Sequence, residues 1–265
     1  MVISKYLVIV SILFLFLAQV DNSFETESLS KIFKEQVANI NHDQVYIDWL
    51  TGDALRQISA ASGSYQTQYF VYVDRNPEAQ NIMLGLFDSV EKNITIIGWD
   101  KVSTGNPKIK GHFVTPTGIF VNSVTNMGYR AQGTKNSNGW RGLGKKGSRV
   151  WDFGWQKTQY KNEEREIRLL LHATDPDFGE RRLGKVDSKG CVRITAKLNY
   201  FLDHYGILDN EYEQSIASGT VSWLLPKDRE TVKNPGQLMI VGDSYWVFMG
   251  ADLLPWQACR GFLFV

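Results

Sequence analysis

A change in hydrophobic pattern near residue 65 constrains the fold of this chain more than any other feature. Up to that point, residues 25–65 carry apolar side chains at helical spacing, which predicts helices. Beyond it come short runs rich in β-branched and aromatic residues, which predict strands. These runs cover residues 68–74, 81–87 and 93–99. The chain is therefore expected to join an N-terminal helical segment to a mostly β body.

The first 22 residues have the layout of a secretory signal peptide. Lys5 is followed by an uncharged, mostly apolar run that ends at Leu17, which is shorter than the roughly 20 residues of a spanning helix. Residues 18–20 meet the small-x-small cleavage rule only in part, so an uncleaved anchor stays open. We expect a protein exported to the periplasm or cell envelope, with no stable membrane span after signal cleavage.

Composition argues against two classes of function. The formal net charge is +1 and the pI is about 7.7, whereas nucleic-acid binding usually needs a strongly basic face. Four histidines and two cysteines are present, but the spacings H-x3-H, C-x2-C and H-E-x-x-H are not. We therefore expect neither a nucleic-acid partner nor a metal site.

The run Asp187-Ser188-Lys189-Gly190-Cys191-Val192-Arg193-Ile194 carries the strongest chemical signal. A thiol attacks a carbonyl well only as the thiolate, and a nearby histidine can serve as its base. His172 stands nineteen positions before Cys191, at the end of an apolar run, and is the best candidate for that base. His112 is a second candidate, and His204 falls in a helix predicted after the cysteine.

Three neighbours of Cys191 suit the same chemistry. Gly190 lets backbone N–H groups converge on the oxyanion of a tetrahedral intermediate. Ser188 can bond to the histidine or to substrate, and Arg193 offers a planar fork for a carboxylate. Each residue alone has a plain structural explanation, but their clustering within six residues favours a catalytic site.

A loop rich in glycine and basic residues covers residues 126–149. Residues 142–147 match the dinucleotide pattern G-x-G-x-x-G literally, but no strand precedes them and no helix follows, so we reject that interpretation. Loops of this length in compact domains usually have a function or are disordered. Because Trp140, Trp151 and Trp155 lie nearby, we expect an ordered flap that faces the substrate.

The second cysteine, Cys259, leaves an alternative open. In an exported protein, two cysteines often form a disulfide. A Cys191–Cys259 disulfide would occupy the nucleophile and favour a non-catalytic role.

The motifs in order resemble the L,D-transpeptidase family, the YkuD-type catalytic domain. His172 and Ser188-Lys189-Gly190-Cys191-Val192-Arg193 match its catalytic signature, while residues 102–105 (Val-Ser-Thr-Gly) and 115–120 (Thr-Pro-Thr-Gly-Ile-Phe) resemble two further family segments. The resemblance covers roughly residues 66–206. The chain departs from the family at Ala173, where glycine is common, and in a charged insert at 175–184.

The resemblance implies a mostly β (α+β) fold, a β-sandwich or incomplete barrel with flanking helices. It implies that Cys191 attacks a peptidoglycan stem peptide next to its terminal D-alanine, with His172 as base. The Gly190 and Cys191 N–H groups would form the oxyanion hole, Ser188 would support the histidine or substrate, and Arg193 would hold a peptide carboxylate. No cofactor is implied.

The resemblance does not decide what takes up the acyl group. An amine from a second stem peptide gives a transpeptidase, and water gives a carboxypeptidase or a cross-link hydrolase. A catalytically silent wall-binding domain is the third alternative.

The remaining sequence completes the expected layout. After Cys191 a helix is expected, with Thr195 as N-cap and Gly206 at its end. Two strands are expected at 236–242 and 245–249. The resulting layout is a signal peptide (1–22), a helical segment (25–65), a catalytic domain (66–206) and a C-terminal extension packed on it (207–265).

Overall fold

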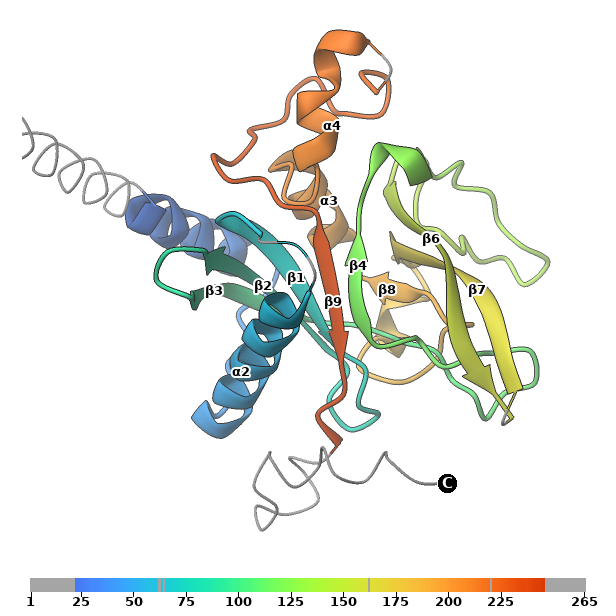
Figure 1. Ribbon diagram of the computed structural model, residues 1–265. Coiled ribbons are helices and arrows are strands. Elements are labelled where there is room, and N and C mark those ends of the chain that lie inside the picture. The colour runs from blue at the N-terminus through green and yellow to red at the C-terminus, as the bar shows by residue number, and fades with distance from the viewer. Residues whose placement is uncertain (1–21, 62, 64, 162, 220, 246–265) are drawn as a thin grey trace, which may run out of the picture.

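The computed structural model describes residues 22–61, 63, 65–161, 163–219 and 221–245. Two β-sheets form the body, and helices cover them (Figure 1). The sheets are mixed, because each contains one parallel pair among antiparallel ones. The expected mostly β, α+β fold is confirmed, and the strands of the described residues form no closed barrel.

The first sheet has five strands in the order β3-β2-β1-β9-β4. Its strands are β1 (Gln68–Asp74), β2 (Asn81–Asp88), β3 (Asn93–Lys101), β4 (Gly118–Val121) and β9 (Leu238–Gly242). The three strands expected from sequence are confirmed, each within two residues at its end. Strand β1 is buried along its whole length, which explains why its sequence is apolar without alternation.

The second sheet has four strands in the order β5-β6-β7-β8. Its strands are β5 (Tyr129–Arg130), β6 (Arg149–Tyr160), β7 (Glu163–Ala173) and β8 (Val192–Ile194). Strands β6 and β7 form a long hairpin with a bulge between Asp152 and Trp155. Strand β8 runs parallel to β7, which brings the sequence after Cys191 beside the sequence that ends at His172.

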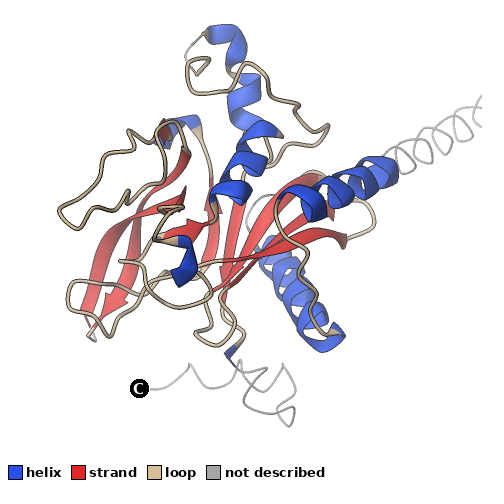
Figure 2. Cartoon of the chain, turned by 180° about the vertical axis from the view of Figure 1, so that it is seen from behind, coloured by secondary structure: helices blue, strands red, loops and turns tan. Residues whose placement is uncertain are grey.

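Helix α2 (Gln44–Ala60) packs on one face of the first sheet. Asp43 caps it by accepting a hydrogen bond from the Tyr46 N–H. Its fully buried side chains, Leu50 and Ala54, contact a cluster that includes Phe70 of β1. Figure 2 shows this helix on the outside of the strands, so α2 covers the sheet face that turns away from the second sheet.

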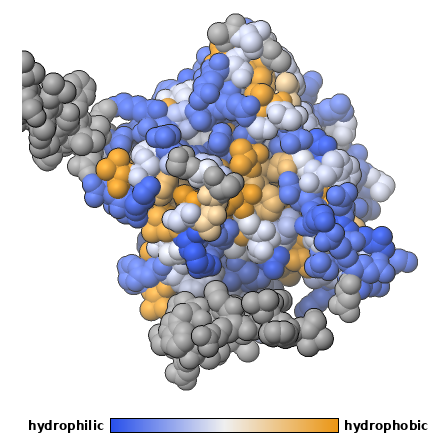
Figure 3. Space-filling model, in the orientation of Figure 1, coloured by the Kyte–Doolittle hydropathy of each residue, from blue (hydrophilic) through white to orange (hydrophobic). Residues whose placement is uncertain are grey.

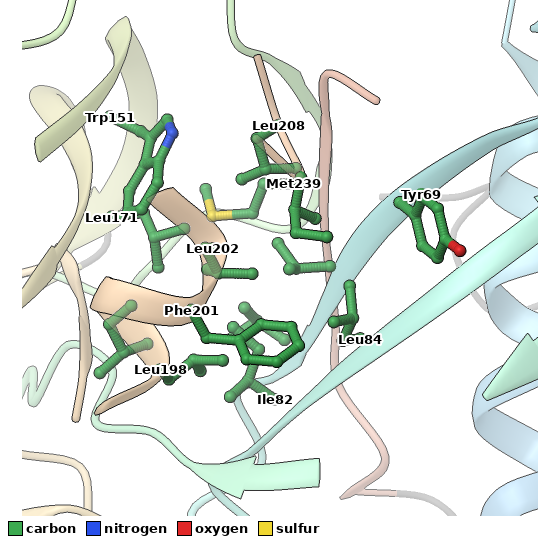
Figure 4. Close-up of a cluster of buried hydrophobic side chains, with 14 of the residues drawn as sticks. Tyr69, Ile82, Leu84, Trp151, Leu171, Leu198, Phe201, Leu202, Leu208 and Met239 are labelled. Carbon is green, nitrogen blue, oxygen red and sulfur yellow. The ribbon is translucent and has the colours of Figure 1, made fainter. Parts of the chain in front are cut away.

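The main core lies between the two sheets. It contains Tyr69 and Leu84 from the first sheet, Trp151 and Leu171 from the second, and Phe201 from helix α3 (Figure 4). Helix α3 (Ala196–His204) begins after Thr195, whose hydroxyl accepts from the Leu198 N–H, as the sequence predicted. The N-terminal helix, described over residues 22–36, also packs into this core.

The segment after residue 206 is more than an added extension. It forms α4 (Asn210–Gln214) and then β9, which lies between β1 and β4 and completes the first sheet. This segment therefore contributes a strand to the first sheet, and the expected division at 206/207 stays a prediction. The short helices η1 (Val124–Asn126), η2 (Glu180–Arg182) and η3 (Ile216–Ser218) lie in connecting loops.

Three sequence predictions fall on residues that the structure does not describe. They are the signal peptide apart from residue 22, most of the strand expected at 245–249, and Cys259. Within the described ranges, every helix is too short or too polar to cross a bilayer. Figure 3 shows hydrophobic residues near the centre of the face drawn in Figure 1, with hydrophilic residues over the β6–β7 side.

Candidate active site

Strand register places His172 and Arg193 on one face of the second sheet. In the β7–β8 pair, Leu171 lies opposite Val192 and His172 lies opposite Arg193. Leu171 and Val192 belong to the core. Because side chains alternate along a strand, His172 and Arg193 point to the other face, and Cys191 immediately precedes β8.

The three sequence motifs meet at this point. The hydroxyl of Thr115 donates to the Gly190 carbonyl (2.8 Å) and accepts from the Gly105 N–H (2.9 Å). Ser103 pairs with Arg193 through two backbone hydrogen bonds of 3.0 Å. A side chain at Gly105 would overlap the backbone of Phe113. The glycine is therefore required for this close packing of motifs that are far apart in sequence.

The imidazole of His172 is held in one tautomer. Its Nδ1 lies 2.7 Å from the Ala173 carbonyl oxygen, which can only accept, so Nδ1 carries the proton and Nε2 is left with a lone pair. The side chain is 3% exposed. Burial, with a smaller contribution from Arg193, lowers its pKa to about 4. At neutral pH, His172 is thus an uncharged imidazole that carries its proton on Nδ1 and a lone pair on Nε2.

Among the described residues, Cys191 makes no disulfide, and its side chain is half-buried. Its Sγ lies 3.6 Å from the Arg168 carbonyl oxygen. Burial raises the thiol pKa, and Asp152 adds to this, while a backbone hydrogen bond at Leu170 and the charge of Arg193 oppose it. Together with His172, this describes a neutral thiol and a neutral imidazole at pH 7, so attack by the thiol requires a base to take its proton.

Ser188 and Gly190 build the turn that presents Cys191. Ser188 Oγ donates to the Cys191 carbonyl (2.5 Å) and accepts from the Gly190 N–H (3.0 Å). These bonds hold the Ser188 hydroxyl within the turn, and its expected role in supporting the histidine or the substrate stays a prediction. They also engage the Gly190 N–H, whose expected role as an oxyanion donor likewise stays a prediction. Gly190 has a φ of 132°, which favours glycine at this position.

Arg193 is half-buried and bound to an acidic partner. Its Nη1 lies 3.3 Å from both the backbone oxygen and Oδ2 of Asp187. Arg182 binds the other carboxylate oxygen of Asp187. The guanidinium of Arg193 is therefore fixed close to His172 and Cys191 before any ligand is present.

The structure adds residues near the thiol that sequence reasoning missed. Asp152 pairs with Arg168 at 2.9 Å from both carboxylate oxygens, and its charge reaches Cys191. The charge of Cys191 in turn helps to raise the pKa of Tyr129, after burial and Asp152. Only the pairing of β5, β6 and β7 brings these residues together, and the sequence carries no motif that marks them.

The other two histidines considered from sequence lie away from the β7–β8 pair. The Nδ1 of His112 bonds to the Ser188 carbonyl at 2.9 Å, so His112 supports the turn from outside. His204 lies at the end of α3, where it stacks on Tyr200. Of the three, His172 alone lies on the strand that pairs with β8.

The glycine-rich loop is ordered and attached to the insert that follows His172. The backbone N–H of Arg141 donates to Asp175 (2.7 Å), and the Trp140 ring lies 5.0 Å from the Arg182 guanidinium. A side chain at Gly144 would meet Ala173 at 2.8 Å. The loop therefore reaches the residue next to His172, while its expected role in facing substrate stays a prediction.

Within the described residues, no group of three or more His, Cys, Asp or Glu side chains could hold a metal ion.

The low pKa of His172 makes the fold sensitive to acid. An unfolded histidine has a pKa of about 6.5, so protons favour the unfolded chain below that pH. The free energy of unfolding is therefore highest above pH 6.5. It decreases by about 3 kcal/mol in total as the pH falls towards 4. Urea unfolding at pH 7 and pH 4.5 should show the loss in wild type. The loss should be smaller in His172→Gln, and equal losses would contradict the buried, neutral imidazole.

Removal of the carboxylate at Asp152 should make the thiol more reactive. Asp152→Asn removes a negative charge that raises the Cys191 pKa and leaves Arg168 as an unpaired cation nearby. We expect Cys191 to be alkylated by iodoacetamide about threefold to tenfold faster at pH 7.5. Glu166→Gln, an exposed change two residues from Arg168, is the matched control and should have little effect. Slower alkylation of Asp152→Asn would contradict this electrostatic assignment.

Comparison with known proteins adds little to this description. No family model matches the chain, and no curated protein matches it. One solved structure with some similarity is a fused Zn-dependent amidase/peptidase/peptidoglycan-binding domain-containing protein from Clostridium acetobutylicum. The match has 14% identity and a TM-score of 0.33, and it covers 77% of this chain and 65% of that one. A similarity this low carries no argument about the function of the chain.

Proposed function

We propose that this protein is a cysteine-dependent acyltransferase of the L,D-transpeptidase type that acts on peptidoglycan stem peptides outside the cytoplasm. The observation that carries the proposal is the convergence of the three motifs around Cys191. Thr115 links Gly105 to Gly190, and Ser103 pairs with Arg193. A cysteine and a histidine that occurred in one chain by chance would not be expected to come with these additional contacts between motifs.

In the acylation step, the lone pair of His172 Nε2 takes the thiol proton as Cys191 Sγ attacks the carbonyl that precedes the terminal D-alanine. The Ala173 carbonyl keeps Nδ1 protonated and stabilises the imidazolium that forms. The Gly190 and Cys191 N–H groups are the candidate donors to the oxyanion. The imidazolium then protonates the leaving amine, D-alanine departs, and a thioester remains on Cys191.

In the second step, the amine of another stem peptide attacks the thioester. His172 takes a proton from that amine, the C–S bond breaks, and the thiolate recovers the proton. The products are a new amide cross-link and the starting enzyme. Water in place of the amine would give a carboxypeptidase through the same residues.

Incubation of the protein with disaccharide-tetrapeptide tests the proposal, with products identified by mass spectrometry. A cross-linked dimer with release of D-alanine is the expected result. Formation of tripeptide without cross-linked dimer would mean that water takes up the acyl group and that the protein is a hydrolase. Unchanged tetrapeptide under conditions where the protein is folded would refute the proposed activity.

A further inference from the structure

Two guanidinium groups converge on one carboxylate beside the candidate nucleophile. Asp187 accepts from Arg193 through Oδ2 and from Arg182 through Oδ1. Two cations and one anion leave this cluster with a formal charge of +1. The cluster therefore attracts a further negative group to the neighbourhood of Cys191.

The two arginines differ in their access to solvent. The side chain of Arg193 is 23% exposed, and its Nη1 already contacts Asp187 twice. The side chain of Arg182 is 45% exposed, although it makes an ion pair with Asp187. Arg182 is thus the member of the pair that a ligand in solution can reach more easily.

Arg182 is also held in place from a second side. The ring of Trp140 lies 5.0 Å from its guanidinium, and Trp140 itself belongs to the loop that Arg141 ties to Asp175. A guanidinium fixed by an aromatic ring and a carboxylate loses less side-chain entropy when it binds an anion. An arginine that served only as a surface charge would not be expected to have both an aromatic and a carboxylate contact.

The proposed reaction supplies a suitable anion. In a donor peptide, the C-terminal carboxylate is attached to the α-carbon of the leaving residue, two bonds from the scissile nitrogen. When the scissile carbonyl is at Cys191, that carboxylate must lie close by. The charge of Arg193 acts on Cys191, and Asp187 joins Arg193 to Arg182, so the cationic cluster extends from the neighbourhood of the thiol to Arg182.

We propose that Arg182, supported by Trp140, binds the free C-terminal carboxylate of the donor peptide and makes the protein select charged over amidated C-termini. This inference rests on the proposed function. It assigns specificity to the charged insert at 175–184, which departs from the family pattern, and gives the glycine-rich loop a role in placing that residue.

Binding to the inactive Cys191→Ala protein tests this inference without turnover. Isothermal titration would compare disaccharide-tetrapeptide with the same compound carrying a C-terminal carboxamide. Arg182→Gln should weaken binding of the free acid by about tenfold to a hundredfold, as expected for a charge-assisted hydrogen bond. It should leave binding of the carboxamide nearly unchanged. Arg181→Gln is the matched control, since it makes the same change at the preceding, exposed residue of η2, and should change neither.

Arg182→Lys covers the case in which Arg182→Gln does not fold. Lysine keeps the charge but lacks the planar fork, so it should weaken binding of the free acid by an intermediate factor. Equal affinity of the parent Cys191→Ala protein for the two peptides, including no measurable binding of either, would overturn the inference. So would an equal effect of Arg182→Gln on both. Failure of wild type to form an acyl-enzyme would instead refute the proposed function, so the two failures are distinguishable.

Discussion

Replacement of Cys191 by alanine should lower turnover of disaccharide-tetrapeptide by about 10⁵-fold, the scale seen when a catalytic nucleophile is removed. The thiol makes no disulfide among the described residues, and Cys191 immediately precedes β8, which pairs with the strand that carries His172. The side chain is small, so alanine should leave the fold intact. The measurement is the initial rate of D-alanine release, followed by mass spectrometry of the products.

Two controls make the Cys191 result specific. Circular dichroism and the thermal midpoint should be close to those of wild type in Cys191→Ala. Cys191→Ser replaces the thiol by a hydroxyl, which is much harder to ionise. This variant should also be strongly impaired. Formation of dimer or tripeptide by Cys191→Ala at a rate near that of wild type would contradict the assignment.

Replacement of His172 by glutamine should lower kcat by about 10³-fold, because general-base assistance typically contributes 10² to 10⁴. Glutamine is uncharged, as the imidazole is at neutral pH, but it cannot accept the thiol proton. The loss should be greatest near neutral pH and should shrink as the pH rises, because hydroxide then deprotonates the thiol directly. The measurement is the pH profile of acylation in single-turnover experiments.

The other histidines provide the comparison. His204→Gln lies at the end of α3 and should behave like wild type. His112→Gln removes a contact with the Ser188 carbonyl and should have a moderate effect that does not depend on pH. A loss in His112→Gln that matches the loss and pH dependence of His172→Gln would instead favour His112 as the base, the alternative that sequence left open.

The elements that sequence predicted correctly are those with strong local signals. The strands at 68–74, 81–87 and 93–99 follow from β-branched and aromatic runs, and α3 follows from its Thr195 cap and apolar stripe. A strand was expected at 236–242, where β9 lies. Its place in the first sheet could not be predicted, because its pairing with β1 joins residues about 170 positions apart.

The candidate reacting groups could be named from the sequence. The groups that surround them in the structure could not. Cys191 and His172 belong to motifs, whereas the Ala173 carbonyl that fixes the imidazole is a backbone group that any residue possesses. Asp152 and Arg168 come near the thiol only through the β6–β7 register. The hydrogen bond from the Gly190 N–H to the Ser188 hydroxyl could not be predicted either, because it depends on the geometry of the turn.

The most direct test of the account is the mass of the protein itself during turnover. The protein would be mixed with disaccharide-tetrapeptide, quenched in acid and analysed intact, and its peptides would then be mapped. The account predicts an added mass equal to the substrate less D-alanine, located on Cys191. Turnover without that adduct, or an adduct on another residue, would contradict the central claim that Cys191 carries the acyl group.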